Sequence, residues 1–187
     1  MKERIPPGQK LSNRLVPLHV ESPIPKIPGE IWYLEIKGMV ERPLRWTLRE
    51  FIPMAQDSLT CDFHCVTGWS VLNLTWQGMY FQRLLDEVRP FPEAKCVLFE
   101  AQSEYTTSLP LDYLSREPAI IAHSLQGKPI PPENGGPLRL VVPGKYAYKS
   151  LKWLCTIRFL DKEVLGYWEE RGYSNSADPW KEERYDW

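Results

Sequence analysis

The 187-residue sequence lacks several features that would place it in a class at once. It has no apolar run long enough to span a bilayer, and residues 1–7 lack the apolar core of a secretion signal. Neither charge dominates, since 23 Lys and Arg face 24 Asp and Glu, which argues against nucleic acid or an anionic membrane as a partner. Four cysteines in a chain of this length are too few for a disulfide framework. These absences together predict a cytoplasmic protein.

What is present suits one strand-rich domain over residues 1–187. The chain is long enough to bury a core, and eight Trp and nine Tyr add large side chains to it. We find no internal repeat, low-complexity block or interior linker. Residues 1–12 are expected to form a loose basic tail, and Pro17–Pro28 an extended surface segment. The expected fold class is α+β, with mixed sheets and a few short helices.

Local patterns predict the individual elements. Apolar runs and alternation predict strands at Ile31–Val40, Leu59–Val66, Lys95–Ala101, Tyr105–Leu109, Ala119–Leu125, Leu138–Val142 and Trp153–Leu160. The spacing of Thr47 and Glu50 is that of a capping box and predicts a short helix. A second helix is expected over Met79–Val88 and a loop over Asn134–Pro137. Residues 166–187, which are aromatic and charged, are expected to wrap the surface.

A first cluster of reactive residues surrounds Cys65. This residue is expected at a strand end beside a turn near Gly68, where a thiolate, a soft ligand, can reach a cavity and bind a redox metal. An isolated Cys is more often a small buried apolar residue. Cys61 lies four residues earlier, but zinc needs about four ligands and the remaining Cys and His are not suitably spaced. His64 should point to the opposite face of the strand, so it is poorly placed to activate Cys65 as a nucleophile.

A second cluster combines a glycine loop with cations. Backbone N–H groups of the loop at Gly135 and Gly136 can hold an anion, and nearby cations add positive charge. These cations are Arg139, Lys145, Lys149 and Lys152. The segment predicts a compact anionic ligand, although a basic solvated face around a hairpin would give the same pattern. Phosphate-binding signatures for nucleotides, such as a Walker loop, do not occur.

Four motifs in register resemble those of one enzyme family. They read HCVTGWS from His64, WQG from Trp76, GGPLRLVVP from Gly135 and KSLKW from Lys149. From about Pro17 to the C-terminus, their order and spacing resemble the sulfite oxidase-like, oxidoreductase molybdopterin-binding family, and the ending resembles its short single-domain members. The resemblance implies the sulfite-oxidase-type fold, a molybdenum–molybdopterin cofactor and two-electron oxygen-atom transfer.

The resemblance also implies roles for individual residues. Cys65 would be the protein ligand of molybdenum, and Tyr105 would belong to the catalytic pocket near the metal. The cofactor would be contacted by His19, Asn134, Arg139, Lys145, Ser150, Leu151 and Lys152, the last three partly through their backbone. Among these residues, Arg139 and Lys152 would meet its phosphate.

Departures from the family pattern bear on the substrate. Sulfite oxidases carry arginines just after the ligand Cys to hold a dianion, whereas this chain has Val66, Thr67, Gly68 and Trp69 there. The sequence resembles more closely the methionine sulfoxide reductases of the family. A Thr that contacts the cofactor in those reductases is Ala101 here, so substrate identity does not transfer from them. From the neutral positions after Cys65 we predict reduction of a neutral sulfoxide or N-oxide, with its apolar part against aromatic side chains such as Trp69, Trp76 and Tyr105.

Electrons for this reaction must come from an external transfer partner, because no haem, flavin or iron–sulfur motif is present. Three alternatives to this reaction stay open. They are a non-catalytic molybdopterin carrier, an enzyme that oxidises sulfite, and a structural β domain without a cofactor.

Overall fold

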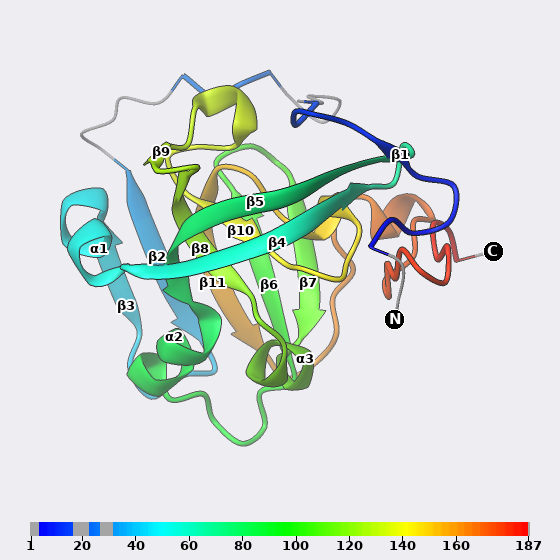
Figure 1. The fold of residues 1–187 in the computed structure, drawn as a ribbon. Helices are drawn as coiled ribbons and strands as arrows, with labels where there is room; N and C mark the ends of the chain where they lie inside the picture. Colours follow the sequence, from blue (N-terminus) through cyan, green and yellow to red (C-terminus); the bar gives the residue numbers. More distant parts are fainter. Residues whose placement is uncertain (1–3, 17–22, 27–31, 187) are drawn as a thin grey trace.

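The computed structural model describes residues 4–16, 23–26 and 32–186, and its body consists of two sheets (Figure 1). The first contains β1 (Lys10–Leu11), β4 (Asp57–Cys65), β5 (Trp69–Tyr80), β8 (Ile120–Leu125), β9 (Lys128–Pro129) and β10 (Arg139–Val141). The second contains β2 (Tyr33–Gly38), β3 (Leu44–Thr47), β6 (Cys96–Ala101), β7 (Thr106–Pro110) and β11 (Leu154–Leu160). Parallel pairs (β1 with β5, β2 with β11) occur beside antiparallel ones, so both sheets are mixed, as predicted.

The helices are short. They are α1 (Leu48–Met54), α2 (Phe81–Val88) and α3 (Leu111–Arg116), with 3-10 turns η1 (Pro132–Asn134), η2 (Ala147–Lys149) and η3 (Glu169–Arg171). The predicted capping box is confirmed at α1, where Glu50 N–H donates to Thr47 Oγ1 and Thr47 N–H donates to the Glu50 carboxylate. The second predicted helix begins later than expected, because Met79 still pairs with Ile121 in the sheet.

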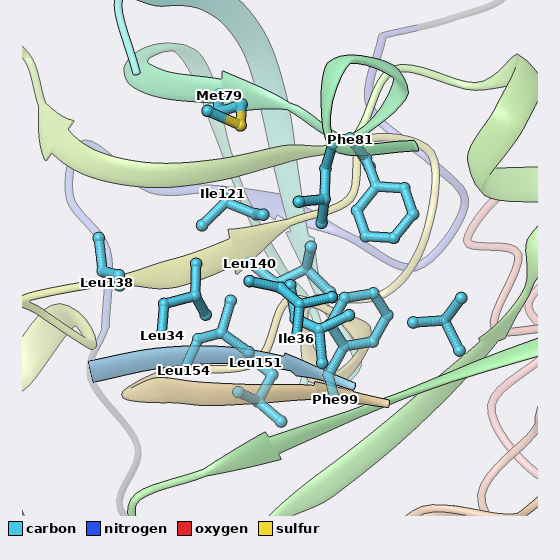
Figure 2. Close-up of a cluster of buried hydrophobic side chains, with 14 of the residues drawn as sticks. Leu34, Ile36, Met79, Phe81, Phe99, Ile121, Leu138, Leu140, Leu151 and Leu154 are labelled. Carbon is cyan, nitrogen blue, oxygen red and sulfur yellow. The ribbon is translucent and has the colours of Figure 1, made fainter. Parts of the chain in front are cut away.

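The main core lies between the two sheets. Leu34 and Ile36 of β2 are fully buried, whereas the alternate residues Glu35 and Lys37 reach the surface, which is the alternation that the sequence showed. Figure 2 shows these two side chains packed with residues of β5, β6, β8, β10 and β11. Burial of this cluster holds the two sheets together.

The longest strand, β5, was not predicted. It has 12 residues and joins β4 to β8. Two residues interrupt the regular pattern that would reveal a strand. Asn73 has a positive φ of 56°, and at Gly78 a Cβ atom would lie 2.0 Å from the carbonyl oxygen of Ile121. Strand β5 is therefore defined by its neighbours in the sheet rather than by its own alternation.

The expectation of a loose N-terminal tail is wrong for residues 4–12. Strand β1 adds to the edge of β5, where the N–H groups of Lys10 and Ser12 donate to the carbonyls of Gly68 and Ser70 at 2.9 and 2.8 Å. Arg4 forms an ion pair with Asp62 at 2.6 Å. The unpaired backbone groups of β5 thus bind a segment whose own sequence has no strand pattern. Most of Pro17–Pro28, for which we predicted an extended surface segment, lies outside the described residues.

The C-terminal segment, residues 161–186, wraps one end of the sheets (Figure 1), as predicted for its part from residue 166 onward. Backbone hydrogen bonds join it to the body, from Tyr167 N–H to Thr106 at 3.0 Å and from Tyr146 N–H to Ala177 at 2.8 Å. Arg184 donates to the carbonyl oxygen of Val66, directly after Cys65. Among the described residues, no helix is long and apolar enough to cross a membrane.

Candidate active site

A cavity of about 220 Å³ lies where the end of β4, the η1 and η2 turns and the C-terminal segment meet. It brings together six residues that the sequence proposed from three separate regions: Cys65, Tyr105, Asn134, Arg139, Ser150 and Lys152. These residues lie up to 87 positions apart in the chain, counting from Cys65 to Lys152. Their convergence on one cavity is a property of the fold and makes this cavity the candidate active site.

Cys65 is the last residue of β4, and its side chain forms part of the cavity wall. The turn that follows is closed by a hydrogen bond from Gly68 N–H to the Cys65 carbonyl at 3.0 Å, and Gly68 has a φ of 99°, which favours glycine. Gln9 donates to the same carbonyl at 3.1 Å. The Thr67 hydroxyl lies 3.2 Å from Cys65 Sγ. Two hydrogen bonds to its carbonyl oxygen thus fix the backbone of Cys65 at the cavity wall.

His64 points away from the cavity, as strand geometry required. Its Nδ1 lies 2.8 Å from Ser70 Oγ, and its ring contacts the edge of Trp180 with a centroid separation of 5.1 Å. Burial lowers the pKa of His64. The imidazole is therefore a packed group rather than a base for Cys65.

Cys61 has a different environment from Cys65. It packs beside the second hydrophobic cluster, which contains Trp76, and burial raises the pKa of its thiol to about 12. A register shift separates Cys61 from Phe63 along β4. Trp76 is itself fully buried, so of the two tryptophans proposed to meet substrate only Trp69 lines the cavity.

Arg139 supplies a buried positive charge at the cavity wall. Its guanidinium donates to the carbonyls of Asn134 at 2.7 Å and Ser150 at 2.8 Å, and it lies 5.2 Å from the ring centroids of both Phe63 and Trp76. Burial lowers the pKa of Arg139 to about 10. No carboxylate within the described residues forms an ion pair with it. A buried cation held only by carbonyls is suited to an anionic ligand.

The glycine loop lies against Lys152. At Gly135, where φ is 95°, an added Cβ atom would lie 2.6 Å from Lys152 Cγ, so a side chain there would displace the lysine. Lys152 and Asn134 both line the cavity. The loop therefore adds a second cation to the cavity that Arg139 lines, and two cations in one cavity suit a phosphate.

Tyr105 and Ser150 line the cavity, but their hydroxyl groups also stabilise its wall. The Tyr105 hydroxyl donates to the Tyr148 carbonyl at 2.6 Å, and Ser150 Oγ accepts from Val142 N–H at 2.9 Å. Both side chains are largely buried. Their polar atoms thus hold the η2 turn, from which Tyr148 also reaches the cavity.

Of the residues proposed for the cofactor, Lys145 and the Leu151 side chain are not brought to this cavity. Lys145 donates to the Ser176 carbonyl at 2.6 Å and lies 4.8 Å from the Tyr113 ring centroid. The Leu151 side chain is fully buried in the main core, and its carbonyl accepts from Leu140 N–H. His19 lies outside the described residues. Contacts made by the folded chain therefore direct Lys145 and the Leu151 side chain elsewhere.

Lys149, which the sequence suggested as a cation beside the glycine loop, forms a buried ion pair with Glu169 instead. Its Nζ also donates to Asn175 Oδ1 at 2.8 Å and to the Ser108 carbonyl at 3.1 Å. The Thr107 hydroxyl donates to the Glu169 carboxylate at 2.8 Å. Burial lowers the pKa of Lys149. The pair joins the η2 turn to the C-terminal segment directly behind the cavity wall.

Sequence reasoning missed part of the wall. Trp168 and Tyr173 of the C-terminal segment line the cavity, as do Leu15 and Val16 from the N-terminal side. The density of aromatic residues after Gly166 was the available signal, but it was interpreted only as a surface wrap. These four side chains are apolar or weakly polar, so they enlarge the neutral part of the cavity.

Comparison with known proteins identifies the family. The family model of the oxidoreductase molybdopterin binding domain matches residues 21–168. This chain belongs to that family. An uncharacterized oxidoreductase of Bacillus subtilis, YuiH, is 35% identical over 98% of this chain and 93% of its own length.

Other relatives are longer than this chain. The protein-methionine-sulfoxide reductase catalytic subunit MsrP of Gluconobacter oxydans is 31% identical over 79% of this chain, and the match spans 54% of MsrP. Among solved structures, the sulfane dehydrogenase SoxCD of Paracoccus pantotrophus aligns with a TM-score of 0.70 at 24% identity, covering 76% of this chain and 41% of that chain. This structural likeness confirms the sulfite-oxidase-type fold.

The family assignment confirms an oxidoreductase enzyme of the molybdopterin-binding kind and implies a molybdenum cofactor. The residues at the cavity fit such a group: Cys65 offers a soft sulfur ligand, Arg139 an uncompensated buried charge, and Gly135 a close backbone approach beside Lys152. Within the part of the chain that the structure describes, no three His, Cys, Asp or Glu side chains group as a site for another metal.

Proposed function

We propose that this enzyme reduces a small neutral sulfoxide or N-oxide by two-electron oxygen-atom transfer, with molybdenum bound to Cys65. One molybdopterin would lie in the cavity, with its phosphate at Arg139 and Lys152 and its pterin near Asn134 and Ser150. When bound, this cofactor supplies the two-electron chemistry, and the protein positions it and controls access. Location in the cytoplasm remains a prediction from the sequence.

The observation that carries the proposal is the neutral wall around Cys65. The cavity is lined there by Val66, Thr67 and Trp69, and also by Trp168 and Tyr173 of the C-terminal segment. In the described lining, the cations are Arg139 and Lys152, which we assign to the phosphate. A sulfite dianion needs several charge-assisted hydrogen bonds, each contributing about 1.5–3 kcal/mol. A neutral substrate with an apolar part suits this wall better.

The protein residues have separate tasks in this proposal. Cys65 binds the metal as thiolate, and the hydroxyl of Thr67 lies close enough to stabilise its charge. Trp69, Trp168 and Tyr173 contact the substrate and exclude water. Tyr105 borders the same cavity and remains our second candidate for a catalytic residue, with its hydroxyl oriented by the Tyr148 carbonyl.

Steady-state kinetics of protein made in a host that synthesises molybdopterin tests the proposal. We expect about one molybdenum and one pterin per chain, and a higher kcat/KM for methionine sulfoxide or trimethylamine N-oxide with reduced viologen than for sulfite with ferricyanide. A higher value for sulfite would reverse the direction that we propose. Loaded protein without turnover on any of these substrates would instead favour the carrier alternative.

A further inference from the structure

A line of aromatic rings joins the cavity to the surface. Trp168 and Tyr173 line the cavity, and their ring centroids are 5.0 Å apart. Tyr173 is followed by Tyr185, again with centroids 5.0 Å apart, and the two residues also form a backbone bridge. Tyr185 is 46% exposed. Tyr185 therefore links a ring of the cavity wall to the exposed surface.

The surface around Tyr185 is acidic with an apolar centre. Residues 161–186 contain eight Asp and Glu but four Lys and Arg, whereas residues 1–160 contain 16 acidic and 19 basic residues. Asn175 donates to Glu163 at 2.6 Å and to Asp186 at 2.8 Å, so these carboxylates lie on the same surface. Leu165, two positions after Glu163, is 43% exposed.

We call this surface the C-terminal face and define it by Glu163, Val164, Leu165, Glu170, Tyr185 and Asp186, all of which are exposed. An apolar centre with a charged rim is the usual composition of a protein docking site. Lys162 and Arg171 are exposed there as well, so this rim is acidic on balance. A net negative rim attracts a basic partner and accelerates encounter.

We propose that the C-terminal face is the docking site of a one-electron carrier protein with a basic surface. This inference rests on the proposed function, which consumes two electrons and two protons for each oxygen atom removed as water. Two reduced carriers would dock in turn, and each would be oxidised by one electron. The carrier must dock where its redox group comes near the cavity, because electron transfer slows steeply with distance, and the rings from Tyr185 to Trp168 mark such a place.

The first test uses the loaded wild-type enzyme and cytochrome c, a small basic haem protein, as probe. Enzyme reduced by viologen and freed of excess reductant is mixed with ferric cytochrome c, and two haems should be reduced per enzyme. The rate at low protein concentration should fall at least tenfold between low ionic strength and 0.5 M salt, since screening weakens charge steering. Turnover with the small viologen dye should change little. A haem reduction rate that does not respond to salt would overturn the proposal.

The second test uses matched charge reversals. Glu170→Lys with Asp186→Lys should slow haem reduction about tenfold at low salt and leave viologen-driven turnover unchanged. The control, Asp86→Lys with Glu87→Lys, makes the same charge change on α2, away from the C-terminal segment (Figure 1), and should have little effect on either rate. Equal slowing by both pairs would show that net charge, and not this face, controls the encounter.

A third variant, Tyr185→Ala, tests the contact at the centre of the face. It should lower the haem reduction rate at saturating cytochrome c several-fold, with viologen turnover preserved. Wild-type rates with the probe would contradict a role for this ring. Failure of the proposed function is recognised separately, because it would appear as a loss of viologen-driven turnover in the wild-type enzyme itself.

Discussion

Cys61 and Cys65 lie on the same strand four residues apart, yet only Cys65 lines the cavity. Cys65→Ser should abolish turnover while the fold is kept, because a hydroxyl is a poorer ligand for molybdenum than thiolate and the change in volume is small. Cys61→Ser should keep most of the activity. Kinetics and molybdenum content of both variants decide this, and the opposite pattern would mean that the metal is bound at Cys61.

Arg139 and Lys145 were both proposed for the cofactor, but the structure places only Arg139 at the cavity. Arg139→Met removes a charge-assisted contact worth about 1.5–3 kcal/mol, so we expect pterin affinity to fall by about ten- to a hundredfold. Pterin and molybdenum content after gel filtration measure the effect. The matched variant Lys145→Ala should bind cofactor normally, since its ammonium is held by the Ser176 carbonyl. Equal losses in both variants would restore Lys145 as a ligand.

At the scale of elements, α1 is the one whose start was predicted most closely. Thr47 and Glu50 exchange hydrogen bonds across the first turn, so the free N–H groups of the helix start are satisfied locally. Thr47→Ala should lower the free energy of unfolding by about 1 kcal/mol, whereas Thr47→Ser should keep most of it. Urea denaturation measures both. Equal stability of the two variants would show that the cap contributes little here.

The edge strand β1, unlike the start of α1, could not be predicted from its own residues. Residues 4–12 carry little pattern of their own, and their conformation depends on free backbone groups of β5 and on the ion pair between Arg4 and Asp62. Long-range pairing of this kind cannot be inferred from a short window of sequence. The same holds for β5, in which Gly78 allows close contact with β8.

At the scale of the whole molecule, the Lys149–Glu169 pair connects the C-terminal segment to the cofactor side of the cavity. Glu169→Leu alone leaves Lys149 buried without its counter-ion and should destabilise the apoprotein by about 3–5 kcal/mol. Lys149→Met combined with Glu169→Leu removes both charges and should recover much of that loss. Urea denaturation of the three proteins is the measurement. A double variant less stable than the single one would refute this explanation.

The sequence by itself determined those features that depend on neighbouring residues. Apolar alternation located β2, and the Thr47–Glu50 spacing located α1, because both arise from interactions within a few positions. The placement of Cys65 at a strand end, with His64 turned away, followed from the twofold repeat of a strand. The order of the motifs was also sufficient to identify the family, which the family model confirms.

Only the tertiary structure decided which side chains share the cavity. Arg139, Lys145, Lys149 and Lys152 lie within 14 positions, yet Arg139 and Lys152 reach the cavity while the other two bind the C-terminal segment. The direction of each lysine depends on Ser176 or Glu169, which follow 31 and 20 positions later. A buried charge takes the orientation in which it finds a partner, and in this chain those partners are supplied by segments that meet only in the folded molecule.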